Sequence, residues 1–580
     1  MKHNCLKYIF PVLLALTAQS CSLDETLMDR PTPATISTEG DVTALITGLY
    51  SRFNDPGMFK FQGHIMLTVC ADDFHSFSGS EYGPYAQRVM TSANTGAMWN
   101  GLYLTIANAN GLIAMLDKLE LSEEFEQRAY GEAYFIRAFC FYYLVRLYGG
   151  VPIRLTPTTV DADHYLPRTS VAYTYAQIFE DFKQASELLP LKNDIPISEL
   201  GRASKGAAQA MLAQAYLTYG DQLLQKGEDA TAYFNEAVVY ADSVINSGQY
   251  ALVSNYADLF DIGKETLAYN EVIFGIRFQT DPTNRAQPAA GSEYALRFNA
   301  ANTWYVSASG NNQNGDGVYR VNHWFADHYR MGDYVDVDST EFDYRNEAAF
   351  WQRSTGNNHN IYFSYPHVVP AGIPNNVLRQ PLCRKYIDPT GKDNRNHGND
   401  FFIIRLAEVY LIKAEALNEL HGGPTPEALT AFNTVRERAR KADGLAIRSV
   451  PADLTAATAG SQIEFRMKIF DDRGLELVGE GQRWFDLVRM PSPLGNNVSM
   501  YEYQFLYRLN NKLDGYPTYR AFISNNSDYP TYNNTTKLWS YHHGIHASQL
   551  NVIVPKFLLF PIPLGELVQN KNFGDQNPGW

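Results

Sequence analysis

Apolar positions in the first 245 residues recur at intervals of three and four, the spacing that buries one face of an α-helix. The first stripe runs from Val42 to Phe53 and follows Thr38, which together with Asp41 indicates a helix N-terminus. A second stripe runs from Trp99 to Leu116. The pattern predicts four further helices: one from Ser122 to the glycines at 149–150, one from Ser170 to Pro190, and two at about 204–219 and 230–245.

The pattern changes between residues 246 and 400, where helical periodicity is weak and Asn, Gly, Asp, Tyr and Trp accumulate. Residues 309–317 read as loop because nearly all of them are Gly, Asn, Asp, Ser or Gln. Helical periodicity returns at 401–420, 426–441 and 463–478, the last after a capping box formed by Ser461 and Glu464. A second loop-rich stretch, about 491–555, precedes a tail that we expect to be extended.

Small residues lie where paired helices would meet. Ala207 and Ala208 with Tyr216, and Ala414 with Tyr410, suit the contacts of tetratricopeptide (TPR) helix pairs, although no strict 34-residue period is present. We therefore predict a mostly α fold, a TPR-like helical-hairpin solenoid with large loop-rich insertions. The expected regions are a lipoprotein signal peptide (1–20), an N-terminal helical region (21–245), an aromatic- and loop-rich insert (246–400), C-terminal TPR-like helices (401–490) and a loop-rich C-terminal region with the tail (491–580).

The N-terminus has the features of a secretory signal. Lys2 and Lys7 precede a short apolar run at 8–16, and small residues lead to Cys21. A cysteine at the cleavage point resembles a bacterial lipobox, in which the thiol is acylated and anchors the protein to a membrane. The alternative is an ordinary signal with an incidental cysteine. No later segment has 18 consecutive apolar residues, so we expect the mature protein to lie on a membrane rather than within it.

Composition limits the possible partners. The chain has 48 Lys and Arg against 62 Asp and Glu, a net charge of −14, which argues against nucleic acid as the main partner. Aromatic residues make up 13% of the chain, more than a core needs, so we expect exposed rings. After the signal and the anchor are set aside, Cys70, Cys140 and Cys383 are too few for a disulfide framework, and Cys140 fits a core position.

Six blocks of the chain form recognisable motifs in a fixed order: 131–139 (GEAYFIRAF) with 147–152 (LYGGVP), 167–190, 201–208 (GRASKGAA), 405–411 (RLAEVYL) with 433–439 (NTVRERA), 473–477 (RGLEL) with 481–489 (GQRWFDLVR), and 559–563 (LFPIP) with 576–580 (QNPGW). Together they resemble the SusD/RagB family of nutrient-binding outer-membrane lipoproteins of Bacteroidetes. The resemblance implies a lipid-anchored outer-membrane protein that is exposed at the cell surface, as Asp24 and Glu25 after Cys21 also suggest by likeness to a surface-export signal. It also implies a lid over a SusC-like TonB-dependent transporter and a glycan-binding insert, with no cofactor.

Aromatic side chains of the insert are the candidate glycan contacts, because a ring offers an apolar plane to the C–H face of a sugar. We expect Trp304, Tyr305 and Trp324 to form stacking platforms, and Arg379 to hydrogen-bond a hydroxyl or a carboxylate. The alternative for Arg379 is a solvated position in a loop. Trp351 is a weaker candidate. From the N-terminal region we expect Asp73, Tyr82 and Trp99 to contribute, although Trp99 also continues a buried stripe. The alternative for all these rings is that they pack the core of the insert.

Other chemistry has little support in the sequence. Asn312, Asn314 and Asp316 imitate the start of a calcium loop, but His323 stands where the loop needs Glu. His542, His543 and His546 lack a nearby carboxylate, so we expect no metal site. Glu476 and Glu480 lie four residues apart, and we expect them to be solvated or paired with Arg473 and Arg483. Two other classes stay open: an all-helical polysaccharide-degrading enzyme, and a TPR assembly lipoprotein that binds only protein.

Overall fold

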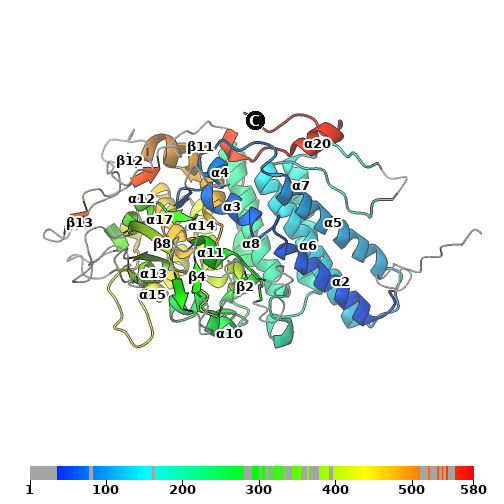
Figure 1. The fold of residues 1–580 in the computed structure, drawn as a ribbon, viewed down its shortest axis with the longest axis horizontal. Coiled ribbons are helices and arrows are strands. Elements are labelled where there is room, and N and C mark those ends of the chain that lie inside the picture. Colours follow the sequence, from blue (N-terminus) through cyan, green and yellow to red (C-terminus); the bar gives the residue numbers. More distant parts are fainter. Residues whose placement is uncertain are drawn as a thin grey trace, which may run out of the picture.

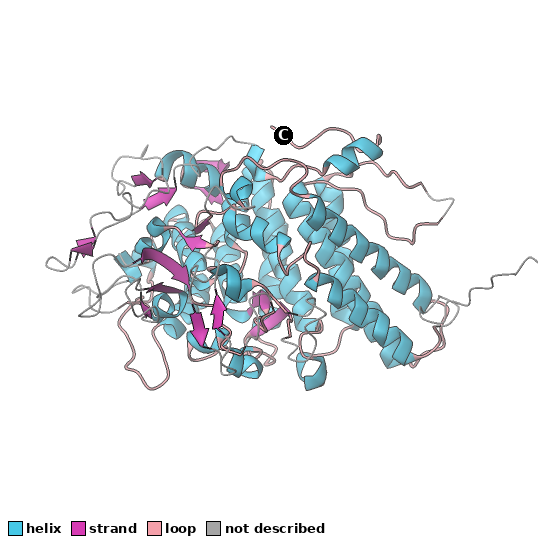
Figure 2. Cartoon of the chain, in the orientation of Figure 1, coloured by secondary structure: helices cyan, strands magenta, loops and turns pink. Residues whose placement is uncertain are grey.

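Helices dominate the chain and strands are short (Figure 2). The computed structural model describes residues 36–76, 82–159, 163–279, 291–298, 304–306, 312–314, 318–329, 332–334, 342–353, 362–364, 378–390, 396–509, 520–522, 532–533, 538–539, 544–546 and 556–580. The signal segment and Cys21 lie outside these residues, so the lipid anchor stays a prediction.

Nine helices of 13 residues or more form the scaffold within the described ranges. They are α2 (Glu39–Ser51), α5 (Gly96–Leu116), α6 (Glu123–Tyr148), α7 (Val171–Leu188), α8 (Lys205–Gln225), α9 (Thr231–Ile245), α14 (Leu406–His421), α15 (Pro426–Ala439) and α17 (Gln462–Glu476). Consecutive helices from α5 to α9 pack against one another; α9 then packs against α14, which contacts α15 and α17 (Figure 1). This row of antiparallel helix pairs confirms the mostly α, TPR-like prediction.

The helix termini follow the local signals in the sequence. Thr38 caps α2 in a reciprocal capping box with Asp41, and Ser461 caps α17 in the same way with Glu464. The Ser204 side chain accepts a hydrogen bond from the third residue of α8. Helix α6 ends at Gly149, whose φ of 78° is one that residues with a Cβ rarely adopt.

Two predicted helix boundaries are wrong. Helix α8, predicted to end at about 219, continues to Gln225. Residues predicted as the start of a helix at 401 form strand β9 (Phe401–Arg405) instead, and α14 begins only at Leu406. Strand β9 pairs antiparallel with β2 (Val272–Ile276), and both strands are buried along their full length. A short apolar run is compatible with either a buried strand or a helix, and here the long-range pairing with β2 decides for the strand.

The region between α9 and β9 consists of short elements. Its helices are α10 (Glu265–Ala268), α11 (Tyr294–Phe298), α12 (His323–His328) and α13 (Tyr344–Ala349), and its strands besides β2 are β3 (Trp304–Val306), β4 (Asn312–Asn314), β5 (Arg320–Val321), β6 (Phe350–Arg353), β7 (Tyr362–Ser364) and β8 (Leu378–Cys383). Strand β5 pairs with β1 (Phe74–His75), which joins this region to the N-terminal loop. Below, "the insert" means residues 246–400.

The C-terminal region also departs from the extended tail that we expected. It contains a short helix, α20 (Leu564–Gln569). The side chain of Asn570, directly after this helix, donates a hydrogen bond to the carbonyl of Leu166 at 2.8 Å, which joins the segment to the loop before α7. The remaining short elements are α3 (Gln62–Val69), α4 (Gly83–Ala86), α16 (Ala456–Ala459), α18 (Arg483–Arg489), α19 (Met500–Glu502), a π-helix (Tyr503–Arg508), β10 (Pro491–Ser492), β11 (Gly495–Ser499), β12 (Arg520–Phe522), β13 (Tyr532–Asn533), β14 (Leu538–Trp539) and β15 (Gly544–His546).

The main hydrophobic core includes side chains from the scaffold, the insert and the C-terminal segment. A second cluster lies between α14, α15 and α17, and a third at residues 253–272 with Phe402. Cys70, Cys140 and Cys383 are buried and form no disulfide bond. Cys140 is a core residue of α6, as predicted. No helix within the described ranges is both long enough and apolar enough to cross a membrane.

Candidate functional site

Trp324 is fully buried, so the prediction that its ring is an exposed stacking platform is wrong. Its indole Nε1 donates a hydrogen bond to the backbone carbonyl of Asp72 at 2.8 Å, and its ring meets Phe325 edge-on with centroids 5.4 Å apart. A buried indole N–H needs such a partner. Trp324 therefore holds the insert against the N-terminal loop, and its ring is not available to a ligand.

Asp72 connects this contact to the C-terminal scaffold. Its carboxylate forms a two-pronged ion pair with Arg483 of α18, with Nε–Oδ1 at 2.7 Å and Nη2–Oδ2 at 3.1 Å. Burial alone would lower the pKa of Arg483, but Asp72, Tyr329 and Asp471 together outweigh burial and hold this pKa above its ordinary value. Asp72 and Arg483 thus join the N-terminal loop to α18 beneath the insert.

Asp73 and Tyr82 are also buried, which contradicts the expectation that they face a ligand. Burial raises the pKa of the Asp73 carboxyl well above its ordinary value, and the adjacent Asp72 raises it further. The Tyr82 ring packs edge-on against Phe61, and the guanidinium of Arg297 lies 5.2 Å from the centre of the Tyr82 ring. Both side chains stabilise the base of the insert.

Trp99 lies on the buried face of α5, as its place in the apolar stripe indicated. Its ring contacts Tyr148 of α6 edge-on at 5.0 Å and Phe573 of the C-terminal segment at 6.0 Å. The ligand-binding alternative for Trp99 is therefore wrong, because its ring fills the core between the scaffold and the tail.

The other predicted contacts lie on strands of the insert. Trp304 and Tyr305 belong to β3, which pairs antiparallel with β4. Trp351 belongs to β6 and Arg379 to β8, and these two strands are neighbours in a three-stranded sheet ordered β7, β6, β8. The structure thus places Arg379 and Trp351 in one sheet and Trp304 and Tyr305 in a separate hairpin. Their side chains lie outside the described part of the structure, so their roles stay predictions.

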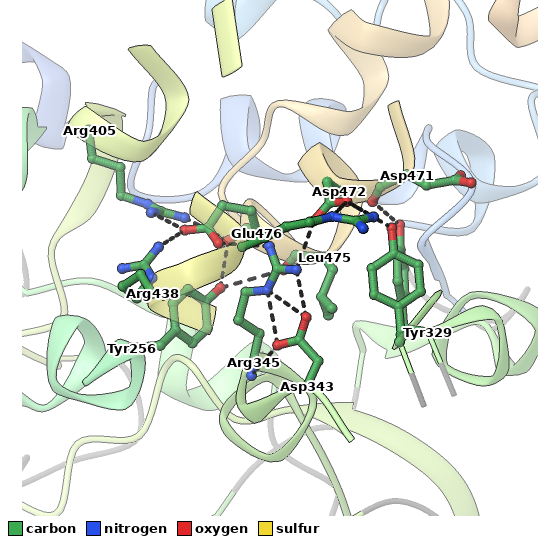
Figure 3. A network of polar contacts seen from close by, with 12 residues as sticks. Tyr256, Tyr329, Asp343, Arg345, Arg405, Arg438, Asp471, Asp472, Leu475 and Glu476 are labelled. Carbon is green, nitrogen blue, oxygen red and sulfur yellow. Dashed lines mark hydrogen bonds and ion pairs between the residues drawn. The ribbon is translucent and has the colours of Figure 1, made fainter. Parts of the chain in front are cut away.

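Ten buried charged residues join the insert to the scaffold. Figure 3 labels Asp343, Arg345, Arg405, Arg438, Asp472 and Glu476 among them. Arg405 bridges Glu271, Glu476 and Glu480, with N–O distances of 2.8, 2.6 and 2.8 Å. Five acids face five bases, so the formal charge of the cluster is zero; its members are Glu271, Asp343, Asp472, Glu476, Glu480, Arg345, Lys385, Arg405, Arg436 and Arg438. We call this set the ion-pair core. Such burial is tolerated because every charge is paired.

Arg345 ties the insert directly to α17. Its guanidinium lies 2.6 Å from Asp343, 2.8 Å from Asp472 and 3.0 Å from Glu476. In Figure 3, Arg345 approaches Glu476 from the insert while Arg405 and Arg438 approach it from the opposite side. Lys385, just after β8, adds a second tie through Glu480 at 2.6 Å. The insert therefore sits on a fixed base.

Glu476 and Glu480 do not form a catalytic acid–base pair. Burial alone would raise the pKa of Glu476, but Arg438, Arg405 and Arg345 outweigh burial and lower this pKa below its ordinary value. The expectation that the two glutamates are solvated or paired with Arg473 and Arg483 is also wrong. Arg473 pairs instead with Glu408 and Asp486, and Arg483 pairs with Asp72.

Glu271, Asp343, Arg345 and Lys385 are the members of the ion-pair core within the insert, and the sequence analysis missed all four. They lie in a region without periodicity, where a charged residue reads as solvated loop. The one available signal was Arg405 directly after four apolar residues, since a buried Arg needs carboxylate partners.

No group of three or more metal-binding side chains comes together among the residues that the structure describes. Asn312 and Asn314 of the calcium-like motif lie in strand β4 rather than in a loop. His546 lies in β15, while His542 and His543 fall outside the described residues.

The fold and the fixed base define a class: a helical-repeat protein that carries a large insert near one end of its row of helices. The model of the SusD family matches residues 270–580, more than half of the chain. A second family model, described as starch-binding and associating with the outer membrane, matches residues 23–217. The chain therefore belongs to the SusD family, which confirms the resemblance seen in the sequence.

Individual relatives agree over nearly the full length. A SusD-like protein of Formosa agariphila is 26% identical, and the match covers 98% of both chains. Among solved structures, a SusD homologue of Bacteroides thetaiotaomicron is 20% identical with a TM-score of 0.72, covering 94% of this chain and 98% of that one. A laminarin-binding SusD-like protein is 20% identical with a TM-score of 0.65, covering 94% of this chain and 100% of that one. These structures share the fold.

Proposed function

We propose that this protein is a cell-surface lipoprotein of the outer membrane that binds glycans and delivers them to a SusC-like TonB-dependent transporter. It is not an enzyme in this proposal. Family membership supports it, as do the description of the second family model and the laminarin binding of one structural neighbour. The observation that carries it is the match to the SusD family model over residues 270–580. The ion-pair core fixes α13 and the segment after β8 to the scaffold, next to the sheet that holds Trp351 and Arg379.

Trp304 and Tyr305 are the proposed stacking platform, with Trp351 and Arg379 as further contacts. A sugar ring presents C–H groups on its faces and hydroxyls at its edge, so a ring and a guanidinium on rigid strands can engage both. Two or three rings and two hydrogen bonds at about 1 kcal/mol each sum to about 5 kcal/mol. This corresponds to a dissociation constant of roughly 0.2 mM for one site. Several binding proteins on one polysaccharide raise the effective affinity by about 10²–10⁴.

Affinity electrophoresis of the full-length protein in gels containing a polysaccharide panel tests glycan binding. We expect Trp304→Ala, Tyr305→Ala and the double variant to lose retention on every glycan that retains the parent, without a change in melting temperature. Tyr173→Ala is the matched control, because this tyrosine is exposed on α7, outside the insert. Parent-like retention of the double variant would remove this platform, and product release from the polysaccharides would favour the enzyme alternative.

The anchor and the transporter have tests of their own. Cys21→Ser removes the thiol that would be acylated, so we expect the protein to leave the outer-membrane fraction in cell fractionation. Pull-down of the parent from native outer membranes should recover a transporter barrel. Recovery of a barrel together with binding to no glycan would favour the assembly-lipoprotein alternative.

A further inference from the structure

A cleft opens beside the insert, lined in part by residues just before β6 and just after β8. One wall is the turn at 255–262, and the opposite wall combines residues 344–348 of α13 with residues 384–389 after β8. Residues 442–445, after α15, close one end. Its volume of about 430 Å³ lies within the usual range for small-ligand sites, roughly 300–1,000 Å³. All of these residues belong to the described part of the chain.

The lining of the cleft is held in place by the ion-pair core and its neighbours. The hydroxyl of Tyr256 donates to the backbone carbonyl of Glu476 at 2.5 Å, and the guanidinium of Arg438 lies 5.0 Å from the Tyr256 ring (Figure 3). On the other wall, Arg448 stacks 3.5 Å from the ring centre of Tyr344, whose hydroxyl donates to the carbonyl of Ala446 at 2.8 Å. A cleft with fixed walls loses little entropy when a ligand enters.

The cleft offers an apolar surface beside hydrogen-bonding groups. The Phe260 ring is half-buried in the turn, with the ammonium of Lys385 4.5 Å from its centre. Leu445 is 58% exposed and lines the end of the cleft. Asn255 and Arg384 can donate to hydroxyl oxygens, and the carboxylates of the lining can accept from hydroxyl groups. This mixture of apolar plane and polar edge suits a sugar ring.

Negative charge dominates the lining. Asp258, Asp261, Glu347 and Asp443 line the cleft with Arg384 as the one cation among its residues, so 1 − 4 gives −3. Lys264 pairs with Asp258 at 2.8 Å and Arg448 with Glu347 at 2.5 Å, and counting both cations leaves 3 − 4, or −1. A site and a ligand that carry charges of the same sign repel each other, which lowers the affinity for that ligand. A carboxylated or sulfated sugar would therefore be repelled at this site.

We propose that this cleft is a second sugar-binding site that takes neutral or amino sugars and rejects uronate and sulfated glycans. The inference rests on the proposed function and adds to it the charge class of the glycan. It locates that selectivity in residues 255–262, 344–348, 384–389 and 442–445 rather than in the aromatic platform.

The first test is affinity electrophoresis of the full-length protein in laminarin, mannan, chitosan, polygalacturonate and a sulfated galactan. We expect retention by at least one of the first three and by neither anionic polymer. Retention by an anionic polymer equal to the best neutral one would overturn the inference while leaving the proposed function intact. Retention by none of the five would overturn both.

The second test fills the cleft with a large side chain. Ala257→Trp should weaken binding of the retained glycan at least fivefold with an unchanged melting temperature, because Ala257 is exposed on the 3-10 helix Tyr256–Phe260. Ala348→Trp on the other wall should weaken binding as much, but it should also lower the melting temperature, because Ala348 packs against the core. If both variants bind like the parent while Trp304→Ala does not, the cleft is not a sugar site.

The third test removes negative charge from the cleft. The double variant Asp261→Asn with Asp443→Asn should increase retention by polygalacturonate at least threefold at low salt. Glu180→Gln with Glu187→Gln removes the same charge from exposed positions on α7 and should leave retention unchanged. The gain should disappear at high salt, because ions screen the repulsion. An equal gain in both double variants would show that net charge, rather than the cleft, rejects anions.

Discussion

The guanidinium Nη1 of Arg405 lies 2.6 Å from Oε1 of Glu476, and both side chains are excluded from solvent. Arg405 ends strand β9 and Glu476 ends helix α17, so this pair joins the buried strand pair to the C-terminal helices. Glu271, at the start of β2, meets the same guanidinium at 2.8 Å. One arginine thus organises the junction between the scaffold and the insert.

We expect Arg405→Ala to lower the free energy of unfolding by about 3–5 kcal/mol, because removal of one partner leaves buried carboxylates without compensation. Urea denaturation followed by circular dichroism measures the change. Lys441→Ala is the control: its ion pair with Glu437 is exposed, so the change should stay within about 0.5 kcal/mol. Equal effects of the two substitutions would show that the ion-pair core does not stabilise the fold.

Substitution of Trp324 gives a second prediction about stability. A buried ring stabilises the fold and its removal is costly, whereas removal of an exposed stacking ring would leave stability unchanged. Trp324→Ala should cost about 3–5 kcal/mol, since a fully buried ring leaves a cavity. Trp324→Phe removes the indole N–H but keeps an aromatic ring. Because Asn322 also donates to the Asp72 carbonyl, the lost hydrogen bond alone should cost about 1 kcal/mol. An unchanged melting temperature for Trp324→Ala would contradict this burial.

Most scaffold helices could be predicted because their signals are local. A cap such as Ser461 with Glu464 depends on residues three positions apart, and an apolar stripe depends on neighbours within two turns. The strand at 401–405 could not be predicted in this way, because its identity depends on β2, more than 100 residues earlier. The division of the chain at residues 20, 245, 400 and 490 stays a prediction.

The candidate site was less predictable than the fold for the same reason. The partner of Trp324 is a backbone carbonyl 252 residues away, so composition around the tryptophan could not reveal whether its ring faces solvent. The partners of Arg405 come from positions 271, 476 and 480. Only the folded chain brings these charges together; the sequence marks Arg405, after four apolar residues, but not its partners.

His64 supplies a prediction about pH. Its ring is buried among five aromatic rings with centroids 4.5–6.3 Å away: Tyr294, Phe298, Tyr319, Tyr386 and Phe401. Burial lowers the pKa of His64 from 6.5 to about 3, and a hydrogen bond with the backbone of Gly479 opposes this only in part. The folded state therefore keeps His64 neutral where the unfolded chain binds a proton.

Stability from this group is fully present above pH 6.5 and is lost as pH falls toward about 3, by about 1.4 kcal/mol per pH unit in the middle of that range. In urea denaturation between pH 7 and pH 4, we expect the slope of the unfolding free energy against pH to be smaller in His64→Gln than in the parent by about 1.4 kcal/mol per pH unit, the contribution of one proton. His164→Gln, at an exposed position, should keep the parental slope. Identical slopes for all three proteins would contradict the neutral buried histidine.

Two glycines test how closely the scaffold helices approach. A Cβ at Gly220 of α8 would lie 2.7 Å from the ring of Phe234 on α9, whereas a Cβ at Gly111 of α5 would meet nothing within 4 Å. Gly220→Ala should cost about 1–3 kcal/mol, because the two helices must move apart. Gly111→Ala should add about 0.5–1 kcal/mol, because alanine loses less backbone entropy in a helix. Urea denaturation of both variants should give changes of opposite sign, and a stabilising Gly220→Ala would mean that α8 and α9 do not pack this closely.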